Sequence, residues 1–404
     1  MIGALAPDRI PPVVKITAVL DRRVPISRYA DPAIPPGGLD TSAVAVVTNA
    51  VKDGAPVVGF GFASIGRFAQ GGLIRERFAP RLIAAGDALS DPETGNLDPD
   101  RAWAAMMTGE KPGGHGERSV AVGALDMAIW DAAAKAAGLP LWRYLARRLG
   151  RDEVAASEPV SVYAGGGYYF PDDDRSRLAD EMAMFRDQGF TRAKIKIGAA
   201  DPDTDRTRIE TAASVLDGPG NLAVDAMNGF DADQAMKTAA ALAPLGLWWL
   251  EDIGDPLDFD LWSDVAAAYP HAIAAGEATF GYADARNLLR YGGLRREKDI
   301  LLFDIAHGYG LPEFIRMVGL AESLGWERAA FWPHGGHLFT LHAVAALGLG
   351  GAEVNPHNFQ PLGGLTDGAK IATGKTPPPD LPGIGFEGRA AAFSLFRELI
   401  EDGA

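Results

Sequence analysis

Short apolar runs alternate with longer helical patterns through the second half of the chain. Such runs predict β-strands, and the helical patterns between them, for example over residues 173–187, 205–216 and 312–324, predict the connections. Strands joined by crossover helices are typical of a parallel α/β barrel. The eight predicted strands are residues 161–164, 192–197, 222–225, 248–251, 273–277, 300–304, 330–333 and 352–354.

The first half has a different pattern, in which strands precede helices. Alternating residues predict a β-meander, and Asp53-Gly54 is a good hairpin signal between its last two strands. A proline- and glycine-rich loop over 22–41 separates the first two strands, and we interpret it as a lid over a substrate. The strands are predicted at 13–20, 42–51 and 56–63, and helices at 75–85, 99–108 and 119–148, the last broken at 138–140.

These patterns predict an organisation in three parts. Residues 1–150 form an α+β domain, and residues 151–376 form the barrel. The tail, 377–404, has a turn-rich part and a final helix, which we expect to pack back on the first domain. The helix over 118–135 carries an apolar face, which predicts ordinary packing.

Composition excludes several classes of function. The 404 residues include 38 basic and 53 acidic side chains, and the net charge of −15 argues against a nucleic-acid partner. The chain has no cysteine, which excludes disulfides and thiolate catalysis and is compatible with a cytoplasmic location. No apolar run approaches the ~18 residues that span a bilayer, and residues 1–12 resemble neither a signal peptide nor a membrane anchor.

Two lysines on one predicted strand are the first candidate functional residues. Lys194 and Lys196 alternate with apolar residues, so both point to one face of the strand over 192–197. Interior lysines lose hydration and need anionic partners. Beside a divalent cation their pKa would be depressed, and a lysine near neutrality can act as a general base.

Three acids supply the partners. Asp225, Glu251 and Glu277 each end an apolar run, and they follow one another at intervals of 26 residues. This spacing suggests successive strand ends of one barrel. Three converging carboxylates without cysteine favour a hard cation, Mg²⁺ with Mn²⁺ possible.

A second group of polar residues follows the later strands. Asp304 ends the sixth predicted strand and His334 follows the seventh, so the aspartate can fix the tautomer of the histidine. His337 lies three residues further on, and a zinc site built from the two histidines is an alternative that lacks an evident third soft ligand. Glu353, near the end of the eighth strand, would bind a substrate carboxylate if it were protonated.

The order of these residues resembles the enolase superfamily, in its mandelate racemase branch. Four further motifs resemble the D-tartrate dehydratase group of that branch: 70–78 (QGGLIRERF), 110–119 (EKPGGHGERS), 284–293 (DARNLLRYGG) and 334–337 (HGGH). The resemblance implies a (β/α)7β barrel, a modified TIM barrel, with an α+β capping domain formed by the N-terminal region and the C-terminal tail.

The resemblance also implies roles. Asp225, Glu251 and Glu277 would bind Mg²⁺, Lys196 would be the base, and Lys194 its electrostatic neighbour. The His334–Asp304 pair would be the acid, and Lys111 would reach in from the capping domain. The implied substrate is a small carboxylate, which loses an α-proton and a β-hydroxyl to give a 2-keto acid, oxaloacetate in the case of tartrate. A homo-oligomer without nucleic-acid or membrane partners is expected.

Two departures from the family pattern concern the substrate. The asparagine expected after the third strand stands one place late, in Asp225-Ala226-Met227-Asn228, and the loop over 22–41 is longer than in D-tartrate dehydratases. Two other functions use the same residues. A racemase or epimerase would place Lys196 and His334 on opposite faces of a 2-hydroxy acid, and a non-catalytic barrel would bind a sugar acid.

Overall fold

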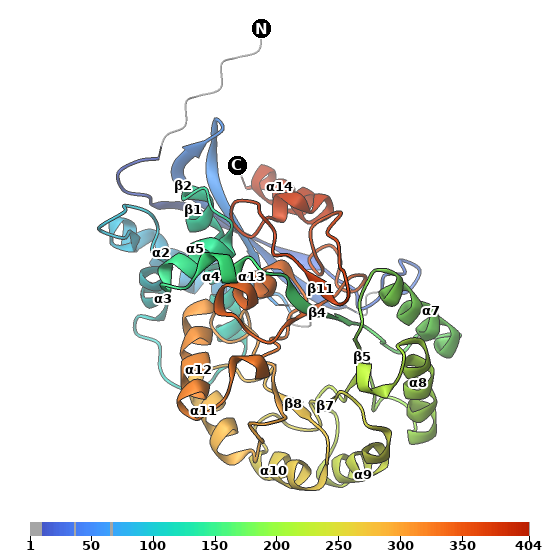
Figure 1. The fold of residues 1–404 in the computed structure, drawn as a ribbon. Helices are drawn as coiled ribbons and strands as arrows, with labels where there is room; N and C mark the ends of the chain where they lie inside the picture. The colour runs from blue at the N-terminus through green and yellow to red at the C-terminus, as the bar shows by residue number, and fades with distance from the viewer. Residues whose placement is uncertain (1–9, 36–37, 65–67, 404) are drawn as a thin grey trace.

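The computed structural model describes residues 10–403, except for 36–37 and 65–67. Part of the 1–12 segment and part of the predicted 22–41 loop therefore lie outside the described residues. A three-stranded antiparallel sheet lies at one side of the barrel in Figure 1, and helices surround the barrel strands. None of the helices within the described ranges has both the length and the apolar character that a membrane crossing requires.

The antiparallel sheet and one long helix form the capping layer. The sheet has the order β1 (Ile16–Pro25), β2 (Asp40–Lys52), β3 (Ala55–Phe62). Helix α4 (Glu117–Ala136) lies directly on β3, because β3 carries glycine where the helix approaches. A Cβ atom at Gly61 would lie only 2.3 Å from the carbonyl oxygen of Ala124.

The structure corrects two predictions in this layer. Strand β1 continues to Pro25 and β2 begins at Asp40, so the connection covers 26–39 rather than 22–41. Helix α4 is buried on all its faces from Ser119 to Lys135, not on one. Its second face meets the barrel, where a Cβ at Gly123 would lie 1.9 Å from the carbonyl oxygen of Ala306.

Seven parallel strands build the barrel wall in the order β10-β4-β5-β6-β7-β8-β9. The eighth strand, predicted at 330–333, is not formed as a strand. A short 3₁₀ turn (Arg328–Ala330) occupies its start, and a single parallel bridge joins Phe331 to Leu301. The carbonyl oxygen of Phe331 accepts from the N–H of Gly350 at 3.0 Å, which continues the wall towards β10. The strands are β4 (Val160–Gly165), β5 (Ala193–Lys196), β6 (Leu222–Asp225), β7 (Trp249–Glu251), β8 (Ile273–Ala275), β9 (Ile300–Leu301) and β10 (Ala352–Val354).

Helices cover the outside of this wall (Figure 1). They are α7 (Asp174–Asp187), α8 (Pro202–Val215), α9 (Ala232–Leu242), α10 (Phe259–Ala268), α11 (Tyr282–Tyr291), α12 (Leu311–Ser323) and α13 (Leu338–Leu347). Each lies between consecutive wall segments, as expected for parallel strands with crossover connections. The first half adds α1 (Gly71–Leu73), a π-helical turn (Ile74–Phe78), α2 (Ala79–Ala85), α3 (Pro99–Met107), α5 (Leu141–Arg148) and α6 (Glu153–Ala156).

The C-terminal tail returns to the capping layer. A short strand β11 (Lys375–Thr376), which the pattern did not predict, pairs antiparallel with β4. Helix α14 (Ala390–Asp402) packs on β2, and the ring of Phe396 stacks on Phe60 with centroids 4.7 Å apart. Aromatic rings fill the barrel interior: Tyr163, Trp249 and Trp332 form a cluster that is nearly excluded from solvent. The polar ends of the strands therefore stand on a packed apolar layer.

Candidate active site

Three acids converge at the carboxyl ends of neighbouring strands. Asp225 is the last residue of β6, and the strand register places it beside Glu251, the last residue of β7. Glu277 lies two residues beyond β8. One carboxylate oxygen from each acid lies within 4.8 Å of the other two, and Asp225 and Glu251 are 1% and 0% exposed. The structure therefore brings together the three predicted metal ligands.

Both lysines of β5 point at these acids. The Nζ of Lys194 lies 2.5 Å from Oε1 of Glu251, and the Nζ of Lys196 donates to Oδ2 of Asp225. Their ammonium groups also lie over aromatic rings, at 5.8 Å from the centroid of Tyr163 for Lys194 and at 5.2 Å from that of Tyr168 for Lys196. The predicted common face of the two lysines is thus the inner face of the barrel.

The pKa of each lysine differs from the sequence prediction. Burial lowers the pKa of Lys196, but the negative charge of Asp225 outweighs it, and the pKa lies above its ordinary value. The pKa of Lys194 is raised for the same reason, with Glu251 as the main anion. The prediction of depressed values assumed a bound cation, whereas in the protein alone the acids determine the direction.

The acids fit a hard divalent cation. Burial raises the pKa of Glu251, and the nearby charges of Asp225 and Glu277 raise it further against the effect of Lys194. Crowded carboxylates of this kind are relieved by a metal ion, and a donor set made of oxygen alone favours Mg²⁺ over softer ions. A fourth acid, Asp252, is 2% exposed, and burial with the charges of Glu277 and Asp225 raises its pKa.

Asp252 also explains the displaced asparagine. The Nδ2 of Asn228 donates to Oδ2 of Asp252 at 2.9 Å, and the N–H of Asn228 donates to the carbonyl oxygen of Asp252 at 2.7 Å. Asn228 therefore braces the loop after β7. The exposed Met227 precedes it, and its N–H donates to Oδ1 of Asp225 at 2.6 Å. Asp252 was not predicted from the sequence, because its place next to Glu251 is its one sequence signal.

His334 and Asp304 form the predicted pair. The Nδ1 of His334 lies 2.7 Å from Oδ2 of Asp304, and its Nε2 lies 3.5 Å from Oε2 of Glu277. Burial lowers the pKa of His334, but the charges of Glu277, Asp304 and Glu353 outweigh it and raise the pKa to about 10. The ring is therefore protonated near neutral pH and can donate a proton.

Two partners of this pair escaped the sequence analysis. Ser64 donates from its Oγ to Oδ2 of Asp304 at 2.8 Å, and the N–H of His307 donates to Oδ1 at 2.7 Å. The rings of His307 and His334 stack with centroids 5.4 Å apart. His307 follows Asp304 by one short turn, which is a usable sequence signal, but Ser64 lies 240 residues away and has none.

The structure also changes which histidines could form the alternative zinc site. Ligand atoms of Asp304, His307 and His334 lie within 4.8 Å of one another, so the grouped histidines are His307 and His334 rather than His334 and His337. His337 instead begins α13, and its ring packs edge-on against Phe62 at 5.0 Å. Burial lowers its pKa to about 4, so the ring is neutral.

Glu353 lies in the site, but its carboxyl group is ionised, whereas binding of a substrate carboxylate needs the protonated form. Its Oε1 lies 3.3 Å from the Nζ of Lys194, and its Oε2 accepts from the N–H of Gly335 at 3.3 Å. Burial raises the pKa of Glu353, but the charges of Lys194 and His334 outweigh it and hold the pKa below its ordinary value. An ionised Glu353 serves as a partner for these cations.

Lys111 is exposed, in the segment that precedes α4. Its carbonyl oxygen accepts from Nη1 of Arg118 at 2.9 Å, and Nε of Arg118 donates to the hydroxyl of Tyr309 at 2.8 Å. The segment thus touches a barrel loop through Arg118. The reach of the Lys111 side chain towards substrate stays a prediction.

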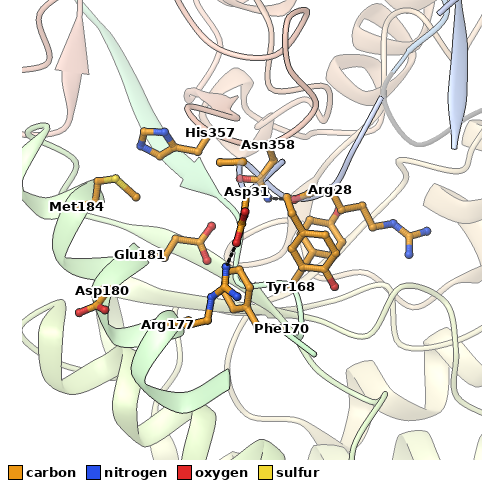
Figure 2. Close-up of a pocket in the computed structure, with 12 residues that line it drawn as sticks. Arg28, Asp31, Tyr168, Phe170, Arg177, Asp180, Glu181, Met184, His357 and Asn358 are labelled. Carbon is orange, nitrogen blue, oxygen red and sulfur yellow. Dashed lines mark hydrogen bonds and ion pairs between the residues drawn. The ribbon is translucent and has the colours of Figure 1, made fainter. Parts of the chain in front are cut away.

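Described residues of the 26–39 connection contact the segments that follow β4 and β10. The carbonyl oxygen of Arg28 accepts from Asn358 at 2.7 Å, and Arg177 of α7 pairs with Asp31 at 2.7 Å. A hollow of about 210 Å³ lies beside Arg28 and Asp31. Figure 2 shows Tyr168 and Glu181 in its wall. The guanidinium of Arg28 lies 5.8 Å from the centroid of Tyr168 and points away from Glu181 (Figure 2).

Comparisons with known proteins show which sequences and folds this chain is similar to. An arabinonate dehydratase of Saccharolobus solfataricus is 26% identical over 288 residues, which are 70% of this chain and 74% of that protein. A 3,6-anhydro-alpha-L-galactonate cycloisomerase of Streptomyces coelicolor is 29% identical over 288 residues, 71% of this chain and 74% of that protein. Among solved structures, a racemase from Streptomyces coelicolor with bound magnesium superposes with a TM-score of 0.74, at 24% identity, over 96% of this chain and 99% of that one.

The family comparison covers more than half of the chain. The sequence model described as "Enolase C-terminal domain-like" matches residues 177–392. This range includes β5 to β10, the three acids of the candidate metal site and the His334–Asp304 pair. The resemblance seen in the sequence is thereby confirmed at the level of the superfamily: the chain belongs to the enolase C-terminal domain-like family.

Proposed function

We propose that this protein is an acid-sugar dehydratase that requires Mg²⁺, with Mn²⁺ as a possible substitute. Lys196 is the base, His334 with Asp304 is the acid, Lys194 holds the acids in place, and Asp225, Glu251 and Glu277 bind the metal ion. Named relatives support the reaction class, since one is a dehydratase and another a cycloisomerase of sugar acids. A racemase of the same fold binds magnesium.

One observation carries this proposal. Lys196 reaches the acid cluster at Asp225, and His334 reaches it at Glu277, from segments on different sides of the barrel. A substrate carboxylate held at the cluster would therefore have a proton acceptor on one side and a proton donor on the other. Syn or anti removal of water from neighbouring carbons needs this pair of groups.

The proposed reaction removes one molecule of water from the acid sugar. Lys196, in its neutral form, takes the α-proton, and the electron pair of the broken C–H bond moves into the carboxylate. His334 gives its proton to the β-hydroxyl, the C–O bond breaks, and water leaves. The electron pair returns to form the carbon–carbon double bond of an enol. The enol then gains a proton at carbon, loses its hydroxyl proton to solvent and becomes a 2-keto acid. When bound, Mg²⁺ supplies positive charge that stabilises the dianion formed by proton loss. A cation held by Asp225, Glu251 and Glu277 would also offset the negative charge of Asp225, which keeps the pKa of Lys196 high.

We further propose a diacid substrate, a 2,3-dihydroxy acid such as D-tartrate, with oxaloacetate as the product. Arg28 supports this, because its guanidinium lies over the ring of Tyr168, and that ring lies over Lys196. A planar guanidinium one ring away from the base suits a second carboxylate. Lys111 and His337 then contribute less to substrate binding than Arg28 does. Glu353 acts by pairing with Lys194.

The test is a 2-keto-acid assay over monoacid and diacid sugars, including all tartrate stereoisomers, with Mg²⁺. Lys196→Ala and His334→Asn should both lose activity. Turnover of D-tartrate alone supports the full proposal, whereas turnover of another acid sugar keeps the mechanism and rejects the substrate.

Racemisation or epimerisation is a second candidate, because the same placement of Lys196 and His334 serves both reactions. α-Proton exchange in deuterated solvent without any keto acid would favour it. The absence of both reactions would favour a non-catalytic sugar-acid-binding barrel. A homo-oligomeric state is also proposed, and analytical ultracentrifugation tests it.

A further inference from the structure

We propose that Ser64 is a positioning residue for the His334–Asp304 pair, through which the capping layer sets the geometry of the acid. Its hydroxyl is completely buried and donates to Oδ2 of Asp304 at 2.8 Å, the same oxygen that accepts from His334 at 2.7 Å. For its kinetic consequence this inference rests on the proposed function.

The capping sheet holds Ser64 in place. The N–H of Ala63 donates to the carbonyl oxygen of Ser42 at 2.9 Å, and the Oγ1 of Thr41 donates to the carbonyl oxygen of Ala63 at 2.5 Å. Thr41 and Ser42 belong to β2, and both are buried. The backbone just before Ser64 is thus tied to a strand of the sheet, so the position of the hydroxyl reports the position of the capping layer.

Asp304 itself is pinned from two directions. His307 donates its N–H to Oδ1 at 2.7 Å, and its ring Nδ1 lies 3.5 Å from Oδ2. Among the described donors to this carboxylate, Ser64 is the one that comes from the capping layer. Three hydrogen bonds fix the carboxylate in one rotamer, and its orientation in turn fixes the plane and tautomer of the His334 ring.

The hydroxyl also limits the freedom of the acid pair. Without Ser64 the carboxylate of Asp304 would keep two of its three hydrogen bonds, those from His307 and His334. It could then rotate, and the ring of His334 would lose its fixed orientation towards a leaving hydroxyl. Proton donation would slow, while proton removal by Lys196, on another part of the barrel, would continue.

Ser64→Ala tests this inference in two independent ways. In the kinetic arm, dehydration should fall roughly 10-fold or more, the size expected for a lost hydrogen bond to a charged group. Exchange of the α-proton with deuterated solvent should fall much less, so the ratio of exchange to dehydration rises. A merely structural defect would lower both rates together.

The second arm needs no substrate. The Nδ1–H proton of His334 should give a far-downfield NMR signal that His334→Asn removes. Ser64→Ala should move this signal. The matched control is Thr48→Val, which removes another buried hydroxyl of the capping sheet, one that donates to Val57 at 2.8 Å. This control should change neither the signal nor the ratio. If Ser64→Ala fails to fold, Ser64→Cys keeps the shape with a weaker donor and should act in the same direction.

The outcomes separate this inference from the proposed function. An unmoved signal in the Ser64 variant overturns the inference, whatever the substrate. A moved signal with an unchanged ratio also overturns it, because the contact then has no effect on the reaction. If the wild-type protein neither dehydrates nor exchanges any acid sugar, the proposed function fails, and the NMR signal alone still decides whether Ser64 positions the pair.

Discussion

The Nζ of Lys194 lies 2.5 Å from Oε1 of Glu251, and both side chains are completely buried. The same ammonium group lies 3.3 Å from Glu353 and 3.8 Å from Asp225. One lysine thus balances three acids at the centre of the barrel. A buried cation of this kind is costly to remove, because its partners stay behind as uncompensated charges.

Lys194→Met should therefore destabilise the metal-free protein by about 3–5 kcal/mol. With saturating Mg²⁺ the difference should shrink, because the metal ion supplies positive charge to the same acids. Thermal unfolding in a chelator and in excess Mg²⁺ measures both effects. Lys298→Met is the control, since the exposed ammonium of Lys298 donates to the carbonyl oxygen of Pro270 at 3.2 Å. An equal loss with and without Mg²⁺ would contradict the argument.

Gly61→Ala should prevent the close contact between the capping sheet and α4. The new Cβ would lie 2.3 Å from the carbonyl oxygen of Ala124, which is backbone and cannot move aside. We expect a loss of about 3 kcal/mol or more, as for severe overpacking. Gly220→Ala is the matched control, because nothing lies within 4 Å of its added Cβ. Chemical denaturation compares the two variants, and similar losses would sink the prediction.

His342 should make stability fall in mild acid. Its Nδ1 accepts from the N–H of Trp142 at 3.0 Å, its Nε2 donates to the carbonyl oxygen of Ile384 at 2.9 Å, and burial lowers its pKa to about 4. The unfolded chain binds a proton near pH 6.5, before the folded chain does. The contribution of neutral His342 to the free energy of unfolding is therefore fully present above pH 6.5. It is lost as the pH falls towards 4, by on the order of 3 kcal/mol.

The free energy of unfolding at pH 7 and pH 4 measures this loss. His342→Gln should lose less on acidification than the wild-type protein, because it has no group to protonate. Parallel pH curves for the wild-type protein and His342→Gln would show that acid acts elsewhere.

Arg28→Met should change substrate preference rather than the chemistry. We expect kcat/KM for a diacid to fall roughly 10-fold or more, since a charged hydrogen bond is lost, with little change for a monoacid. Arg290→Met, on the exposed side of α11, is the control. Equal losses of kcat/KM on diacids and monoacids would show that Arg28 does not bind the second carboxylate of the substrate.

Local patterns predicted much of the fold. The Asp53-Gly54 hairpin, the break in the helix at 138–140 and the alternation of strand and helix after residue 160 all appear in the structure. They could be predicted because each depends on a turn residue or a hydrophobic period within a few positions. The strand predicted at 330–333 failed, because its single bridge to Leu301 depends on barrel closure and not on its own residues.

The sequence by itself determined the candidates for the proposed chemistry: two lysines on one strand face, and acids at the ends of the next three strands. Strand alternation and the regular βα spacing place these groups on one rim, whatever the details of packing. Only the tertiary structure decided their protonation and their partners. The raised pKa of Lys196, the neutral ring of His337 and the hydroxyl of Ser64 on Asp304 all arise from groups distant in sequence. Burial and charge act through space, so no local pattern encodes them.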